Sequence, residues 1–135
     1  MPAQILVIED DQVTQDLMAH LLRVRGHQVV TVMDGDAALQ AVAAVPPDII
    51  LCDINLPTTN GLEVLQRLRQ TELTKTTPVI AITASGAPDQ DGIARVGDRI
   101  TGLGFTAYIP KPIDLKTFAE RIEGYLPDAL RSPAK

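Results

Sequence analysis

Short apolar runs alternate along the chain with longer segments in which apolar residues recur every three or four positions. The runs are rich in β-branched residues and have the length of strands; they cover residues 4–8, 28–32, 49–53, 79–82 and 106–109. The apolar residues between the first two runs have the spacing of a helix: Val13, Leu17, Leu21 and Val24. Strands that alternate with helices need crossover connections, so the pattern predicts a parallel sheet with helices on both faces.

Short polar side chains mark where these helices should begin. The expected N-caps are Asp11, Asp34, Asn60 and Asp114. The residues expected to face inward from the third and last helices are Leu62, Leu65, Leu68, Phe118, Ile122 and Tyr125. Five glycines interrupt the segment after the fourth strand, and each costs a helix about 1 kcal/mol relative to alanine. We therefore expect a weak, mobile helix over residues 92–103.

Composition and charge narrow the class of protein. A chain of 135 residues is the length of one domain, expected over residues 1–126 with a tail over 127–135. Twelve basic residues stand against seventeen acidic ones, and the formal net charge of -5 disfavours direct binding to nucleic acid or to an anionic membrane. No apolar run is long enough to span a bilayer, and residues 1–4 lack the pattern of a signal peptide. We therefore expect a soluble, cytoplasmic protein.

Polar side chains gather at the ends of the predicted strands. The first strand is followed by Glu9 and Asp10, the third ends at Asp53, and the fourth ends at Thr83. Lys111 follows the fifth. The carboxyl ends of parallel strands share one edge of the sheet, where open α/β sheets bind ligands. Clustered carboxylates need a positive partner, and Mg²⁺ prefers oxygen ligands. An acidic site with a hydroxyl and a lysine indicates phosphoryl transfer.

Three other residues with reactive side chains are expected to be structural. Cys52 lies inside a strand, which favours a small buried hydrophobe over a reactive thiol. As the single cysteine of the chain, it cannot form an internal disulfide. His20 and His27 do not fall at the strand-end edge, so we expect both on the surface, one in a helix and one in a loop.

Four motifs, in this order, resemble those of the receiver domains of bacterial two-component response regulators, across roughly residues 3–126. The first strand ends in an acidic pair, in Ile5-Leu6-Val7-Ile8-Glu9-Asp10-Asp11. The third strand leads into Asp53-Ile54-Asn55-Leu56-Pro57, and the fourth into Thr83-Ala84. The fifth leads into Tyr108-Ile109-Pro110-Lys111-Pro112. The resemblance implies a flavodoxin-like (βα)5 fold of class α/β, a doubly wound parallel five-stranded sheet with strand order 2-1-3-4-5.

The resemblance also implies a role for each motif. Asp53 would take a phosphoryl group from the phosphohistidine of a histidine kinase or of a histidine phosphotransfer protein. The ligands of a Mg²⁺ or Mn²⁺ ion would be Glu9, Asp10, Asp53 and the backbone carbonyl of Asn55. The residues implied to bind the phosphoryl group or to switch with it are Thr83, Ala84, Tyr108 and Lys111, with Pro112 as a cis-proline. Tyr108 also suits an ordinary core aromatic, and both interpretations stay open.

By this resemblance the chain is a signalling switch and not an enzyme. Its output partner would bind the face formed by the fourth helix, the fifth strand and the fifth helix. The interval over positions 84–110 holds 27 residues, which is longer than is usual in the family and predicts an unusual partner surface. Met1 and the short tail favour a single-domain regulator or a phosphorelay shuttle over a receiver cut from a larger protein.

Two other functions compete with this one. The first is a receiver-like interaction module that works without phosphorylation, which the intact set of site residues disfavours. The second is a phosphatase with an aspartate nucleophile in an Asp-x-Asp loop. Such an enzyme needs a second acid to protonate the leaving group, and Asn55 occupies that position without being an acid.

Overall fold

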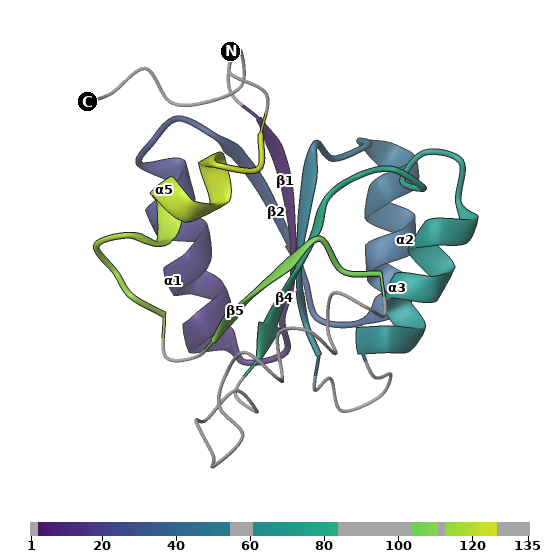
Figure 1. Cartoon of the computed structure of the whole chain (residues 1–135), viewed down its shortest axis with the longest axis horizontal. Coiled ribbons are helices and arrows are strands. Elements are labelled where there is room, and N and C mark those ends of the chain that lie inside the picture. Colours follow the sequence, from purple (N-terminus) through teal and green to yellow (C-terminus); the bar gives the residue numbers. More distant parts are fainter. Residues whose placement is uncertain (1–2, 55–60, 84–103, 111–112, 127–135) are drawn as a thin grey trace.

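The structure, a computed structural model, describes residues 3–54, 61–83, 104–110 and 113–126. Within these ranges, five strands form one parallel sheet (Figure 1). The strands are β1 (Gln4–Ile8), β2 (Gln28–Val32), β3 (Ile49–Asp53), β4 (Val79–Thr83) and β5 (Ala107–Pro110). Their order across the sheet is β2-β1-β3-β4-β5, which confirms the predicted architecture and strand order.

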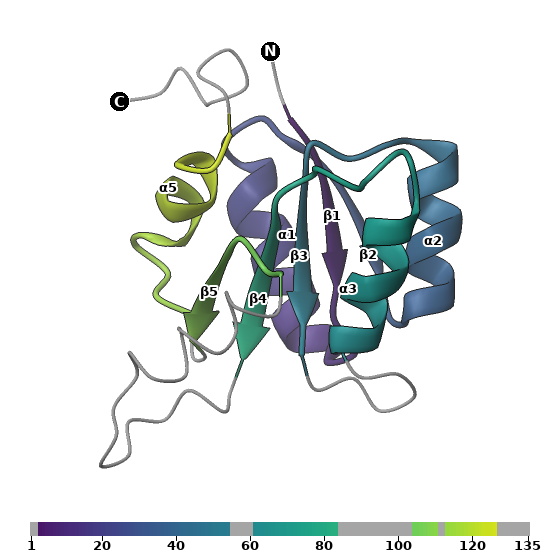
Figure 2. The same ribbon diagram turned by 45° about the vertical axis from the view of Figure 1, so that its right-hand side comes forward.

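Helices cover both faces of the sheet (Figures 1 and 2). One face carries α1 (Gln12–Arg23) and α5 (Phe118–Glu123), and the other carries α2 (Gly35–Ala44) and α3 (Gly61–Gln70). The expected helix over 92–103 lies outside the described residues. Among the helices within the described ranges, none is long and apolar enough to cross a membrane.

Alternate residues of the central strands β1, β3 and β4 pack into two separate cores, one on each face. In β1, Ile5 and Val7 join the cluster under α1 and α5, whereas Leu6 and Ile8 join the cluster under α2 and α3. All four side chains are buried. A strand buried on both faces has no polar side to show, which is why the sequence contains continuous apolar runs instead of alternating ones. The two cores hold the carboxyl ends of the strands in register at one edge.

The expected caps are confirmed at two helices and wrong at a third. The side chains of Asp11 and Asp34 accept N–H groups from the first turns of α1 and α2, over 2.9 and 2.8 Å. Asp114 instead closes the turn that precedes α5, because its Oδ1 accepts the N–H of Lys116 over 2.9 Å. The helix itself begins one turn later, after Thr117. Asn60 lies outside the described residues.

The apolar spacing predicted the helix α1, but the residues that showed this spacing are not the ones that the helix buries. Val13 and Val24 are 76% and 64% exposed. The residues of α1 that are buried are Gln15, Met18, Ala19 and Leu22. This buried stripe includes a polar and a small residue, so a count of large apolar side chains misplaces it. At the end of α5 a similar difference occurs, since Tyr125 is exposed and Leu126 is buried instead.

His20 is exposed as expected, but the expectation for His27 is wrong, because its side chain is buried at the amino-terminal edge of the sheet. The N–H of Ala3 donates to Nδ1 of His27 over 3.1 Å, and Nε2 lies 2.7 Å from Oε2 of Glu123. A histidine directly before a strand would be exposed if no other segment covered it. Here the end of α5 covers His27. This contact joins residues 96 positions apart, so no local pattern reveals it.

Candidate functional site

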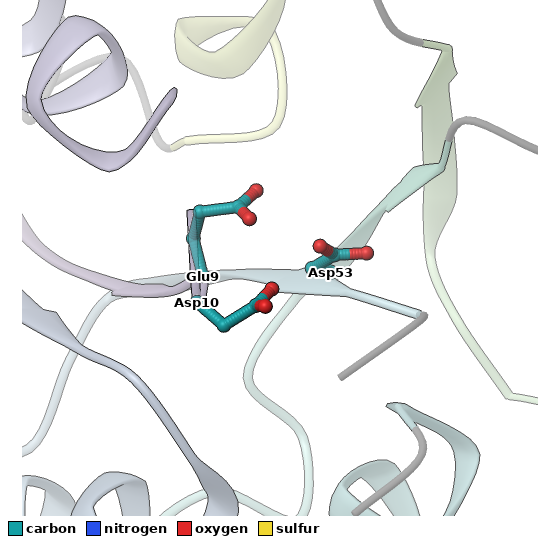
Figure 3. A group of neighbouring side chains, drawn as sticks. All are labelled: Glu9, Asp10 and Asp53. Carbon is teal, nitrogen blue, oxygen red and sulfur yellow. The ribbon is translucent and has the colours of Figure 1, made fainter. Parts of the chain in front are cut away.

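Three carboxylates meet at the carboxyl edge of the sheet (Figure 3). Glu9 and Asp10 directly follow β1, and Asp53 is the last residue of the neighbouring strand β3. One carboxylate oxygen from each residue lies within 4.8 Å of the others. Glu9 and Asp53 are buried, and Asp10 is partly exposed. The fold therefore brings together the acidic residues that the sequence placed at two separate strand ends.

Backbone hydrogen bonds fix these acids. The N–H of Glu9 donates to the carbonyl of Val32, over 3.0 Å, which extends the pairing of β1 with β2. Oε2 of Glu9 accepts the N–H of Asp11 over 3.0 Å. After Asp53, the N–H of Ile54 donates to the carbonyl of Ile82 over 3.1 Å. The side chains are thus presented from ends of strands that are still paired.

Two further predicted site residues lie on the neighbouring strands. Thr83 ends β4 and is buried, and the register pairs Asp53 with Ile82, the residue before Thr83. This places the Thr83 residue at the same edge as the acids. Tyr108 lies in β5 opposite Ala81, is half-buried, and packs against the core under α2 and α3. The remaining predicted site residues lie outside the described residues: Asn55, Ala84, Lys111 and Pro112.

The donor set fits a hard divalent cation. All three groups offer oxygen, and together they carry a formal charge of -3 when ionised. Mg²⁺ and Mn²⁺ are bound by carboxylates, carbonyls and water. A cation with two positive charges offsets most of the repulsion among three carboxylates held this close. The residues present are therefore those that a magnesium site of this kind needs.

Gln15 is part of this corner, although the sequence pattern does not single it out. Its side chain is buried, and its Nε2 donates to the backbone carbonyl of Glu9 over 3.0 Å. A glutamine in a helix is usually a surface residue. The signal that could have found it is its helical spacing from Met18, Ala19 and Leu22, which form the buried side of α1 with it.

Cys52 is buried beside the acids, as expected. Burial, together with the negative charges of Asp53 and Glu9, raises the pKa of its thiol to about 12. A thiol acts as a nucleophile only when it is ionised. Cys52 therefore belongs to the core and not to the chemistry of the site.

The buried thiol should make the fold lose stability in alkali. The unfolded chain ionises Cys52 near its ordinary pKa of 9.0, but the folded protein does so only near 12, so rising pH favours unfolding between these values. Between pH 9 and 10, the unmodified chain should lose about 1 kcal/mol more of its free energy of unfolding than a Cys52→Ala variant. Urea denaturation of both proteins across this range would measure the difference, and equal slopes would contradict it.

Comparisons with known proteins agree with one another. The family model described as the response regulator receiver domain matches residues 5–123. The polar-differentiation response regulator DivK of Brucella anthropi is 35% identical over 129 residues, which cover 96% of this chain and 100% of that protein. The chemotaxis response regulator CheY4 of Vibrio cholerae aligns with a TM-score of 0.82 at 25% identity, over 93% of this chain and 100% of that one.

A further solved structure bears on the acidic cluster. It is the receiver domain of a sensor histidine kinase from Pseudomonas aeruginosa, with a magnesium ion coordinated in the active site cleft. It aligns with this chain at a TM-score of 0.75 and 26% identity, over 93% of this chain and 98% of that one.

Proposed function

The chain belongs to the family of response regulator receiver domains and acts in two-component signalling, and we propose that Asp53 is the residue that accepts the phosphoryl group. The observation that carries the proposal is the position of Asp53, buried at the end of β3 with the carboxylates of Glu9 and Asp10 beside it. Its neighbours can hold a cation, whose charge would counter the negative charge of an incoming phosphoryl group.

In the proposed reaction, an oxygen of Asp53 attacks the phosphorus of a phosphohistidine. The new P–O bond forms as the P–N bond to the imidazole breaks, and the electron pair of the broken bond returns to the ring. Glu9, Asp10 and Asp53, with the backbone carbonyl of Asn55, would hold Mg²⁺ or Mn²⁺. The bound ion supplies positive charge to the phosphoryl oxygens. Lys111 would pair with the same oxygens.

We propose that the switch residues respond to the charge that phosphorylation adds. An aspartyl phosphate offers new acceptor oxygens, to which the hydroxyl of Thr83 at the adjacent strand end could donate. Ala84, being small, would leave room for that approach, and Tyr108 on β5 would follow. Pro112 would serve as the cis-proline beside Lys111. Such a change shifts the population of two states that differ in partner affinity.

The partners of this switch follow from its proposed role. The phosphoryl donor would be a histidine kinase or a histidine phosphotransfer protein in the cytoplasm. The output partner would bind the face that includes β5 and α5. The functional unit would extend over residues 1–126, with 127–135 as a tail. The chain would assist its own phosphorylation and dephosphorylation without turning over a separate substrate.

Phosphorylation should require a divalent cation. When the chain is incubated with acetyl phosphate and Mg²⁺, intact-protein mass spectrometry should detect the addition of one phosphoryl group. When EDTA removes the cation, the rate should fall at least about tenfold, because nothing then offsets the charge of the carboxylates and the phosphate. Beryllium fluoride with Mg²⁺ should change the amide spectrum of the protein. Phosphorylation at the same rate in EDTA would contradict the proposal, and no phosphorylation in Mg²⁺ would favour a phosphorylation-independent interaction module.

A further inference from the structure

The side chain of Gln15 joins the ends of two strands next to the acidic site. Its Nε2 donates to the carbonyl of Glu9 over 3.0 Å and to the carbonyl of Val32 over 3.1 Å. Its Oε1 accepts Nε2 of Gln12 over 3.1 Å. Gln15 is 4% exposed, so these are contacts of a buried amide and not of a surface one. The amide thus uses both of its N–H donors on backbone carbonyls.

These partners determine the orientation of the amide. A backbone carbonyl oxygen can only accept hydrogen bonds, so the NH₂ group of Gln15 must face Glu9 and Val32. A flipped amide would set its own oxygen against two carbonyl oxygens and would leave buried donors unsatisfied, at a cost that buried polar groups rarely bear. Gln12, in the first turn of α1, holds the other end of the amide.

The two carbonyls belong to the point where strand pairing ends. The register of β1 with β2 stops at Ile8 and Val32, and the N–H of Glu9 donates to the Val32 carbonyl just beyond it. After Glu9 the chain turns into α1. The Gln15 amide therefore links the ends of β1 and β2 through a side chain, just beyond their last backbone pair. It does so at Glu9, which carries the first carboxylate of the site.

On the premise of the proposed function, we propose that Gln15 is a positioning residue for the divalent cation site. Glu9 is held at its N–H by Val32, at its carbonyl by Gln15, and at Oε2 by the N–H of Asp11. The carboxylates of the site repel one another, so a loosened backbone would let them move apart. Groups that hold metal ligands in place commonly change metal affinity by about 10- to 100-fold when removed.

The test is a Gln15→Met variant, which keeps the length of the side chain and removes both donors. Isothermal titration with Mg²⁺ should give a dissociation constant about tenfold higher than that of the unmodified chain. Hydrogen exchange at the N–H of Asp11, which donates to Glu9, should be faster in the cation-free protein. This second measurement reports on the positions of the acids without any metal and without phosphorylation.

A matched control separates positioning from general loss of stability. Thr74 is buried in the connection between α3 and β4, before the amino-terminal end of β4 and away from the acidic site. Its hydroxyl donates to the carbonyl of Leu68 over 2.6 Å. Thr74→Val likewise removes buried hydrogen bonding and should lower the melting temperature without changing the Mg²⁺ dissociation constant.

A second variant, Gln12→Ala, tests the inference even if Gln15→Met does not fold. It is changed at an exposed position, removes the contact to Oε1 of Gln15 and should weaken Mg²⁺ binding about threefold.

The outcomes distinguish this inference from the proposed function. If the Gln15→Met and Gln12→Ala variants bind Mg²⁺ with the same dissociation constant as the unmodified chain, Gln15 only stabilises the fold. The inference is then overturned, and the proposed function still stands. Equal weakening in Gln15→Met and Thr74→Val would overturn it as well. If the unmodified chain binds no Mg²⁺ at all, both the inference and the proposed function fail.

Discussion

An Asp53→Asn variant should take no phosphoryl group from acetyl phosphate, yet it should be more stable than the unmodified chain when no divalent cation is present. The amide of asparagine is not a nucleophile for phosphorus, so phosphorylation should be lost completely. Stability should rise because the substitution removes one of three negative charges whose oxygens lie within 4.8 Å. At that separation each pair of charges costs about 1 kcal/mol in water and about 3 kcal/mol at an effective dielectric constant of 20.

The gain should reverse when Mg²⁺ is added. A ligand that binds only the folded state stabilises it by about 2.7 kcal/mol at a hundred times its dissociation constant. The unmodified chain should receive this stabilisation and the Asp53→Asn variant should receive much less. Urea denaturation in EDTA and in Mg²⁺ would therefore rank the two proteins in opposite orders. We expect Asp53→Asn to exceed the unmodified chain by about 1 kcal/mol in EDTA.

Glu72→Gln is the matched control for this experiment. It removes one negative charge from an exposed residue of the α3–β4 connection, where the partner is Lys75 over 2.7 Å. An exposed pair of this kind contributes little to stability, so this variant should keep the phosphorylation and the Mg²⁺ response of the unmodified chain. An Asp53→Asn protein that is less stable in EDTA, or that still gains a phosphoryl group, would show that the carboxylates do not act as described.

The sheet could be predicted almost to the residue because its three central strands, β1, β3 and β4, are buried on both faces and form continuous apolar runs. The run over 79–82 became β4 (Val79–Thr83), and the run over 106–109 became β5 (Ala107–Pro110). The acidic cluster could be predicted because parallel strands have their carboxyl ends at one edge of the sheet, and the acidic residues lie at those ends. Once the order of the strands was implied by the family resemblance, the proximity of Glu9 and Asp53 was already determined.

What local pattern could not predict was any feature decided by a distant segment. The buried face of α1 depends on which side chains the sheet accepts. It accepts Gln15 because the backbone carbonyls of Glu9 and Val32, at the ends of their strands, accept the N–H groups of its amide. His27 was expected on the surface because its neighbours in sequence give no sign of Glu123. Gln15 and His27 are both polar side chains whose burial depends on a partner in another strand or helix, Val32 for Gln15 and Glu123 for His27.

Glu123→Gln should destabilise the protein by about 2–3 kcal/mol, although the substitution changes one atom far from the acidic site. Glu123 is 5% exposed and accepts Nε and Nη2 of Arg25 over 3.0 and 2.6 Å. Its hydrogen bond also raises the pKa of the Arg25 guanidinium. Because the N–H of Ala3 donates to Nδ1 of His27, the proton of that ring lies on Nε2 and is donated to Glu123 over 2.7 Å.

The carboxylate of Glu123 thus accepts hydrogen bonds from three N–H groups, and the amide of a glutamine cannot accept all three. One of the two ends of a glutamine side chain is a donor, which would face a donor of Arg25 or of His27. Arg25 is 27% exposed, so water can solvate part of its charge and the loss should be smaller than for a fully buried pair. Urea denaturation would measure the change, with Glu120→Gln on the exposed side of α5 as the control, expected within about 0.5 kcal/mol of the unmodified chain.

Hydrogen exchange in the same variant tests how α5 is attached to the sheet. Glu123 is the last residue of α5, whereas Ala3 and His27 directly precede β1 and β2. If this contact fixes the end of the helix, Glu123→Gln should speed hydrogen exchange in α5 more than in α2, which packs on the opposite face. A loss below about 1 kcal/mol, or exchange that rises equally in both helices, would mean that the apolar contacts of Phe118 and Ile122 hold α5 in place without it.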